Sequence, residues 1–358
     1  MGGWNALAVP ERAARNARKT AISLTLVLIL SLTLIGCTAT DPAETTPPGD
    51  TAPSADITLP GGTDADNIPG TPESTPLSSR EFSFLFFSDT QADPETGDYS
   101  ETGELLARAA AQTDNIGLVV FGGDTVNDGG DADEWLRFHQ AAGPALEGLT
   151  TAAIPGNHDN YPLLAGQFDY PANAPGRPGE GWFYSFVMGP VFFVMLDSNI
   201  MGAANEADIE WLRNTLQSAD AQQAAWRVVV MHHPMWPAAS IPKDAERAET
   251  MREHFLPVME DYRVDLILCG HQHSYARGAP MSGDSTASQD SGGIVQVMVA
   301  SGGKGAYTVE DSDYIAISAN APNYLLVTAD YESLSAVAYD ASGTIIDSFS
   351  VLPGEALQ

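Results

Sequence analysis

Five short apolar runs in this chain each stop at a small polar cluster. The clusters are Asp89-Thr90-Gln91, Gly123-Asp124, Gly156-Asn157-His158, His232-His233-Pro234 and Gly270-His271-Gln272-His273. A short apolar run that ends abruptly is typical of a buried strand. Because α/β folds place functional residues in the loops that follow strands, we expect these clusters to share one site.

The runs alternate with helix-like stretches and are followed by a strand-rich end. Strands are predicted at 82–87, 118–121, 151–154, 191–196, 226–231 and 266–268, and helices at 104–112, 133–142, 207–218 and 245–262. Further strand-like runs lie at 294–299, 324–329, 334–339 and 344–351. This order predicts an α/β domain in which two sheets pack face to face with helices outside.

Residues 1–36 read as a signal peptide and not as part of the fold. A basic stretch at 12–19 precedes an apolar stretch at 21–35, which is short for a bilayer span of about 20 residues. The ending Leu34-Ile35-Gly36-Cys37 resembles the bacterial lipoprotein signal, in which the cysteine is acylated. We therefore expect a protein lipid-anchored to the cell membrane through Cys37, outside the cytoplasm. An uncleaved anchor helix is the alternative.

Residues 37–80 are rich in Thr, Pro, Asp, Gly and Ser, and this composition predicts a disordered acidic linker. The domain at 81–358 follows it. The sequence holds 47 acidic and 16 basic residues, of which one acid and four bases precede Cys37, so the remainder has a net charge of −34. Such a surface repels polyanions, which makes long nucleic acid a poor partner. The other cysteine, Cys269, is expected to be a small buried core residue.

Histidines concentrate in the clusters. Of seven in the chain, five lie there, whereas His139 and His254 fall in predicted helices and are read as structural. If the backbone is extended at His271-Gln272-His273, the two imidazoles point the same way and can serve adjacent metal ions. Imidazole and carboxylate ligands suit Zn, Mn, Fe or Ni, and no thiolate accompanies them.

The ordered blocks D-x-(H/Q), G-D, G-N-H, H-x-P and G-H-x-H resemble the calcineurin-like metallophosphoesterase superfamily. All five occur in order between Asp89 and His273. The resemblance implies a four-layer αββα sandwich of two mixed β-sheets flanked by helices. It also implies a hydrolase of phosphate mono- or diesters, in which a hydroxide held between two metal ions attacks a small substrate.

Carried over residue by residue, the resemblance implies two metal sites that share Asp124. One would be formed by Asp89, Gln91, Asp124 and His273, and the other by Asp124, Asn157, His232 and His271. His158 would stand beside the scissile phosphate as a proton or hydrogen-bond donor. Asn157 and Asp159 would join His158 in binding substrate. Residues 159–161 could line the pocket, and the alternative for them is a turn with a helix cap.

Three departures from the family qualify this expectation. Gln91 stands where many members have histidine, so the metal at that site is either bound less tightly or is a harder ion such as Mn or Fe, with Zn still open. Asn127 stands where the protein phosphatases of the family carry an aspartate that orients the catalytic histidine, and their phosphate-binding arginine is missing. Purple acid phosphatases carry a metal-binding tyrosine without a match here, so an iron–tyrosinate centre is not expected.

Some readings stay open. His233 either supports the ligands, which we favour, or faces the substrate, and the loop at 301–305 with Lys304 is either a phosphate contact or a plain turn. A non-catalytic metal-bound surface scaffold and a surface protein phosphatase are the alternative functions.

Overall fold

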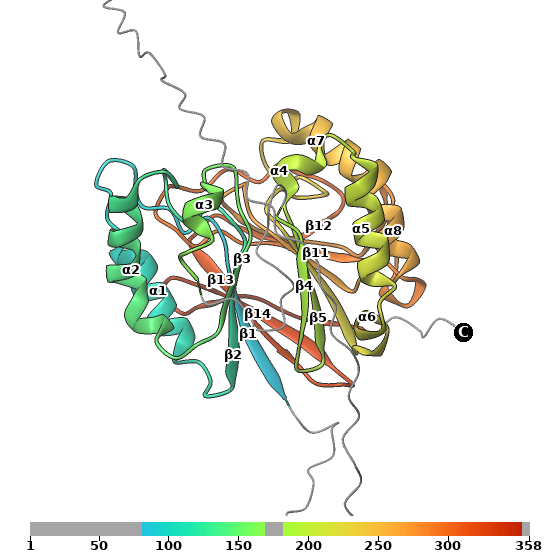
Figure 1. The fold of residues 1–358 in the computed structure, drawn as a ribbon, viewed down its shortest axis with the longest axis horizontal. Helices are drawn as coiled ribbons and strands as arrows, with labels where there is room; N and C mark the ends of the chain where they lie inside the picture. Colours follow the sequence, from blue (N-terminus) through green and yellow to red (C-terminus); the bar gives the residue numbers. More distant parts are fainter. Residues whose placement is uncertain (1–80, 169–181, 353–358) are drawn as a thin grey trace, which may run out of the picture. The chain divides into compact units, whose positions relative to one another are not determined.

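The computed structural model describes residues 81–168 and 182–352. The signal peptide and linker expected over 1–80 lie outside the described residues. The described part contains two large β-sheets with helices beside each of them (Figure 1). This confirms the expected sandwich of two mixed sheets flanked by helices.

The first sheet has six strands. In spatial order they are β15 (Ile345–Val351), β14 (Leu334–Asp340), β13 (Asn323–Ala329), β1 (Phe82–Phe87), β2 (Ile116–Phe121) and β3 (Thr151–Ala153). β1, β2 and β3 run parallel, whereas β13 pairs with β1 in the antiparallel sense. The carboxyl ends of β1, β2 and β3 therefore meet at one edge, where three of the five polar clusters begin.

The second sheet has seven strands. In spatial order they are β12 (Ile315–Ala319), β8 (Tyr275–Gly278), β11 (Val295–Met298), β7 (Leu266–Cys269), β6 (Trp226–Met231), β5 (Val191–Leu196) and β4 (Tyr184–Met188). β5, β6, β7 and β11 are parallel to one another. The other two clusters follow β6 and β7. A small hairpin, β9 (Met281–Ser282) with β10 (Ser285–Thr286), stands apart.

Helices cover both outer faces (Figure 1). Beside the first sheet lie α1 (Ser100–Ala110), α2 (Ala132–Leu146) and α3 (Tyr161–Leu164). Beside the second lie α4 (Ser198–Met201), α5 (Glu206–Leu216), α6 (Ala219–Gln223), α7 (Ile241–His254) and α8 (Leu256–Asp261). None of these described helices has the length and apolar character needed to cross a bilayer.

The two sheets bury a shared apolar core between them. Phe84 of β1 meets Phe193 of β5 edge to face, with ring centroids 5.0 Å apart, and both rings are fully buried. β1 and β5 are buried along nearly their whole length, as expected for strands covered on both faces. A second apolar cluster, to which Cys269 belongs, lies between the second sheet and its helices.

The strand-rich end of the chain completes both sheets. It supplies β13, β14 and β15 to the first sheet and β11 and β12 to the second. Asp347 of β15 accepts hydrogen bonds from Tyr275 Oη at 2.8 Å and from Arg277 Nε at 2.6 Å, and both donors lie on β8. Polar contacts therefore join the sheets in addition to the apolar core.

The predicted elements differ from the structure in a few places. The helix predicted over 245–262 is two helices, because Pro257 lacks the N–H needed to continue α7 and lies instead in the first turn of α8. β4, β8 and β12 were not predicted as strands. β12 is an edge strand with mostly exposed side chains, so it lacks the apolar run used to recognise the others.

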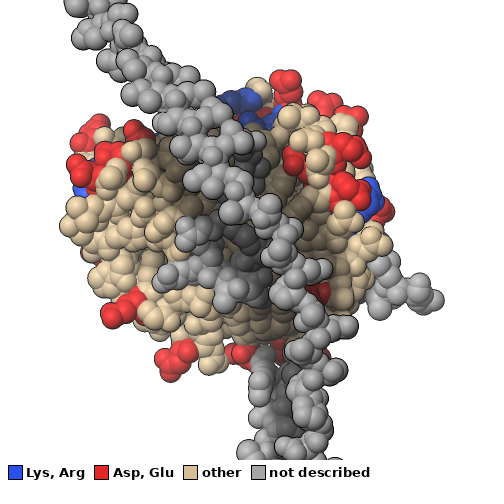
Figure 2. Space-filling view, viewed as in Figure 1, with Lys and Arg blue, Asp and Glu red and all other residues tan. Residues whose placement is uncertain are grey.

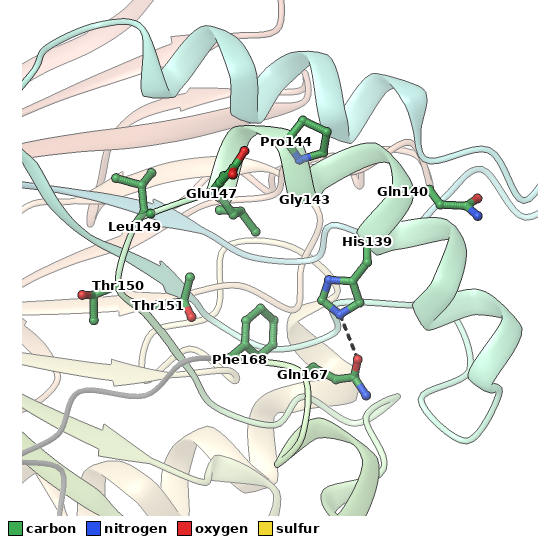
Figure 3. A pocket seen from close by; sticks show the side chains of 12 residues that line it. His139, Gln140, Gly143, Pro144, Glu147, Leu149, Thr150, Thr151, Gln167 and Phe168 are labelled. Atoms are coloured by element: carbon green, nitrogen blue, oxygen red, sulfur yellow. Dashed lines mark hydrogen bonds between the residues drawn. The ribbon is translucent and has the colours of Figure 1, made fainter.

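Acidic side chains dominate the surface charge. Figure 2 shows them spread over one face, with basic side chains visible at few places. A hollow of about 850 Å³ lies beside α2, where His139 Nε2 donates to Gln167 Oε1 at 2.8 Å (Figure 3). Its lining shares no residue with the five polar clusters.

Candidate metal centre

The loops after β1 and β2 hold Asp89 and Asp124 against each other. The backbone N–H of Asp89 donates to the Gly123 carbonyl at 2.9 Å. Both aspartates are buried, and both have a left-handed backbone, with φ of 50° and 52°. Left-handed backbone is costly for a residue with a Cβ and persists only where the surroundings enforce it, typically at functional sites.

The two histidines of the loop after β7 share this unusual conformation. His271 has a φ of 71° and His273 a φ of 43°. Four of the seven predicted ligands therefore have strained backbone, and all four lie directly after strands of the two sheets. The backbone N–H of His271 also donates to Asp89 Oδ2 at 2.8 Å, which joins the two loops.

The side chains form two acceptor triads with one common member. Potential ligand atoms of Asp124, His232 and His271 all lie within 4.8 Å of one another, and so do those of Asp89, Asp124 and His273. All five residues are buried. Asp124 belongs to both triads, as the sequence predicts for a bridging ligand.

Hydrogen bonds to the outer nitrogens fix the imidazole orientations. Nδ1 of His232 donates to the Gly122 carbonyl at 2.9 Å, and Nδ1 of His273 donates to the Gly305 carbonyl at 3.0 Å. In each ring Nε2 is then the unprotonated nitrogen. Such outer bonds set the tautomer of metal-binding histidines.

His271 is oriented the opposite way. Its Nε2 donates to Asp244 Oδ1 at 3.1 Å, so Nδ1 is the free nitrogen. Asp244 lies on α7 and also accepts from Gln272 Nε2 at 2.6 Å. Asp244 has no local sequence signal of a site residue, because it lies in the first turn of an otherwise ordinary helix.

Pairs of electron-donating atoms face each other across the centre. His232 Nε2 lies 3.4 Å from Asp124 Oδ2, and His273 Nε2 lies 3.3 Å from Asp89 Oδ1. When both imidazoles are neutral, as metal-bound rings are, no hydrogen lies between the atoms of either pair. A cation shared by both atoms would satisfy each pair.

Three buried polar atoms of the predicted ligands have no hydrogen-bond partner: Asp89 Oδ1, Gln91 Oε1 and His232 Nε2. Buried polar atoms normally form hydrogen bonds, and a bound metal ion is one reason why such an atom has no hydrogen-bond partner. Gln91 uses its amide nitrogen to donate to the Val126 carbonyl at 3.3 Å, which leaves its oxygen available. The side chains present therefore fit the bound metal ions implied by the sequence.

The electrostatics of the centre also favour bound positive charge. Burial raises the pKa of Asp124, but His232 outweighs burial and lowers it well below its ordinary value. Burial lowers the pKa of His232, but Asp124 and Asp89 outweigh burial and raise it to about 9. The buried carboxylates thus stabilise a cation at the imidazole, whether a proton or a metal ion.

Two glycines allow the loops to approach this closely. A Cβ on Gly156 would lie 2.2 Å from Asp124 Oδ1, and one on Gly270 would lie 2.1 Å from Asp89 Oδ2. No side chain fits at either position without displacing a predicted ligand. These contacts give a physical reason for glycine in G-N-H and G-H-x-H.

Asn157 differs from the other predicted ligands because it is exposed. It lines a cavity of about 720 Å³ together with His271, His233 and Lys243. The centre therefore opens to solvent on the side of Asn157 and His271.

His158 lies at the rim of the centre. Its backbone N–H donates to Asp124 Oδ1 at 2.8 Å, and its Nδ1 donates to the Asn127 carbonyl at 2.8 Å. The carbonyl of Asn127 thus orients the ring, where the protein phosphatases use an aspartate side chain. Glu134 holds this loop by accepting from the backbone N–H of Asn127 at 2.7 Å.

Asp159 faces inward, and its predicted contact with substrate needs correction. Its carboxylate accepts from the backbone N–H groups of Asp124 at 2.7 Å, Gly156 at 2.8 Å and Thr125 at 3.3 Å. Both oxygens are therefore occupied in holding two loops of the centre together. Asn160 caps α3 by accepting from the N–H of Leu163, which is the turn-and-cap alternative.

His233 is buried behind the ligands. Its Nδ1 lies 2.9 Å from Ser198 Oγ, and its ring centroid lies 4.2 Å from that of His271. Burial lowers the pKa of His233, so its ring is neutral. Its packing on His271 agrees with the supporting role favoured from the sequence.

A family model for calcineurin-like phosphoesterases matches residues 82–275. The chain belongs to the calcineurin-like phosphoesterase family. The matched range includes the loops after β1, β2, β3, β6 and β7, and therefore both triads. The superfamily resemblance of the five sequence blocks is thereby confirmed.

Curated relatives of this calcineurin-like phosphoesterase include acid phosphatases. It is 31% identical to purple acid phosphatase 23 of Arabidopsis thaliana over 153 residues, which are 40% of this chain and 32% of the relative. It is 27% identical to acid phosphatase type 7 of Homo sapiens over 164 residues, which are 40% of this chain and 36% of the relative. The chain thus spans about a third of these relatives' length.

Solved structures share the fold of this calcineurin-like phosphoesterase. The purple acid phosphatase from yellow lupin seeds superposes with a TM-score of 0.68 at 19% identity, covering 78% of this chain and 55% of the other. GAP50, described as the anchor in the inner membrane complex of Plasmodium, gives a TM-score of 0.58 at 15% identity, covering 78% of this chain and 91% of GAP50. At these identities the likeness concerns the fold alone.

Proposed function

We propose that this calcineurin-like phosphoesterase hydrolyses small phosphate esters at a dinuclear metal centre. The single observation that carries the proposal is the pair of acceptor triads that share Asp124. One metal ion would be held by Asp89, Gln91, Asp124 and His273. The second would be held by Asp124, Asn157, His232 and His271.

The donor set guides the choice of metal. It consists of imidazole nitrogens and oxygens, and the buried Cys269 is occupied in a contact with the Val297 carbonyl. Zn, Mn and Fe suit such ligands. The neutral oxygen of Gln91 favours Mn or Fe in the site of Asp89 and His273.

When bound, the two ions would supply an acidified water as nucleophile and positive charge for the phosphate oxygens. The side chains of this chain have separate tasks. Asp124 keeps the two sites at a fixed separation, and Asp244 and the Gly122 and Gly305 carbonyls hold the imidazoles in the required tautomers. His158, oriented by the Asn127 carbonyl, stands at the rim, where it contacts the phosphate or the leaving oxygen.

The substrate is expected to be small. The cavity next to Asn157 and His271 measures about 720 Å³, a size suited to a small molecule. The acidic surface disfavours a polyanionic partner such as long nucleic acid. Both monoesters and diesters fit this description.

The proposal is tested with purified protein supplied with Mn²⁺ or Zn²⁺. We expect hydrolysis of p-nitrophenyl phosphate or its bis ester, two metal ions per chain by elemental analysis, and loss of turnover in Asp124→Asn. Equal turnover in Asp124→Asn would refute the assignment. Two bound ions without turnover of any ester would instead support the surface scaffold, and turnover of phosphoproteins alone would support a protein phosphatase.

We also propose that the protein is tethered to the membrane outside the cytoplasm by a lipid on Cys37. Support comes from the basic and apolar segments that precede Leu34-Ile35-Gly36-Cys37. Fractionation of expressing cells should recover the wild type with membranes and Cys37→Ser in the soluble fraction. Membrane retention of Cys37→Ser would favour the uncleaved anchor helix.

A further inference from the structure

Lys304 stands on a loop that is built into the metal centre. The backbone N–H of Ser301 donates to the Ser88 carbonyl at 2.8 Å, next to Asp89. A Cβ on Gly302 would lie 2.3 Å from the Gln91 carbonyl oxygen, so the loop and the first ligand loop touch through their backbones. Gly305 supplies the carbonyl that fixes His273. Lys304 is therefore held between two residues in contact with predicted ligand loops.

The side chain of Lys304 does not extend into water as in a plain turn. It is partly buried, and its Nζ lies 3.1 Å from His158 Nε2. An ammonium group only donates, so His158 Nε2 is the acceptor. Nδ1 of the same ring donates to the Asn127 carbonyl, so both ring nitrogens have partners and the Lys304 ammonium lies at this rim.

Positive charge is scarce in this protein, which makes its position informative. The sequence contains three lysines: Lys19 in the predicted signal peptide, Lys243 in the wall of the substrate cavity, and Lys304. The phosphate-binding arginine of the family's protein phosphatases has no counterpart after Asp124. An anionic ester approaching this acidic surface thus meets cationic side chains next to the centre.

We propose that Lys304 binds the phosphate group of the substrate, donating hydrogen bonds to its oxygens beside His158. This inference rests on the proposed function, because it concerns the same site. On substrate binding the ammonium would exchange its bond to His158 Nε2 for a phosphate oxygen. The loop bearing Lys304 follows β11 and lies outside the matched family range, which ends at residue 275.

The test measures binding of inorganic phosphate to the Mn²⁺-loaded full-length protein by calorimetry. Lys304→Met should bind phosphate at least about tenfold more weakly, because it loses a charge-assisted hydrogen bond. Lys304→Arg keeps the charge and should retain most of the affinity. Arg213→Met is the matched control, since Arg213 lies on α5, pairs with Glu210 and is 41% exposed; its phosphate affinity should equal that of the wild type.

The outcomes separate the two proposals. Equal phosphate affinity in Lys304→Met and the wild type, with turnover still abolished in Asp124→Asn, would overturn the role of Lys304 and leave the phosphoesterase in place. A metal-loaded wild type that binds no phosphate would overturn both. Equal metal content and melting temperature in Lys304→Met and the wild type would show that the weaker binding reflects the missing ammonium.

Discussion

The carboxylate of Asp159 accepts a hydrogen bond of 2.7 Å from the backbone N–H of Asp124. The residue after the predicted catalytic histidine thereby holds the predicted bridging ligand in its left-handed conformation. The same oxygen accepts from Gly156, so one carboxylate ties the loop after β3 to the loop after β2.

Replacement of Asp159 should loosen the centre without removing a ligand. In Asp159→Ala three backbone N–H groups lose their acceptor, and we expect about 2 kcal/mol or more of destabilisation together with weaker metal binding. Asp159→Asn keeps one oxygen and should lie between Asp159→Ala and the wild type. Urea unfolding and metal analysis after gel filtration measure both effects. Unchanged metal content in Asp159→Ala would contradict the positioning role.

Asp244 should tune the affinity of the second metal site through His271. Asp244→Ala removes the acceptor of His271 Nε2 and frees the imidazole to take the other tautomer, so metal affinity should fall roughly 10- to 100-fold. Metal titration against a competing chelator measures this. Asp284→Asn is a suitable control, because the Asp284 side chain is 81% exposed and pairs with Arg252, which is not a predicted ligand. A loss of equal size in Asp284→Asn would point to a general effect of surface charge.

Gln91 should be required for a metal ion to bind in the site that it forms with Asp89, Asp124 and His273. Gln91→Leu keeps a similar volume but removes the unpartnered buried oxygen, so the metal content should fall from two ions toward one per chain. Gln167→Leu, in the hollow beside α2, is the matched control and should keep both ions. Elemental analysis of the purified variants distinguishes these results. Two ions retained in Gln91→Leu would show that this oxygen is not a ligand.

The contact between the sheets at Asp347 should show in the pH dependence of stability. Burial raises the pKa of Asp347, but hydrogen bonds from Arg277 and Tyr275 outweigh it and lower the pKa below its ordinary value of 3.8. A carboxyl with a lower pKa in the folded chain stabilises the fold above its unfolded pKa, and this stabilisation disappears as pH falls through the folded pKa.

Asp347→Asn should therefore cost about 3 kcal/mol near neutral pH, since it leaves Arg277 unpaired in a partly buried site. The difference between variant and wild type should shrink below about pH 4. Urea unfolding at several pH values measures it. A difference independent of pH would show that packing, not the charge of Asp347, is what the substitution removes.

The sequence alone determined most of the buried strands and the predicted ligand set. Buried strands such as β1, β5 and β6 are continuous apolar runs, and a run of this kind can be recognised from the local sequence alone. The residues that end them, Asp89, Asp124, His232, His271 and His273, were recognised because their position after a strand is also a local property.

Only the tertiary structure decided what supports and completes the centre. Asp244 and Glu134 lie on helices without a local signal. For Lys304 the sequence left a phosphate contact and a plain turn open, because its partner His158 is distant in sequence. The sequence indicated Asp159 as a site residue but not that its carboxylate points inward. The orientation depends on the backbone N–H groups of the loops after β2 and β3, which donate to that carboxylate. The order of the strands in the two sheets brings these loops together. That order depends on the packing of the whole chain, so it cannot be predicted from any short segment.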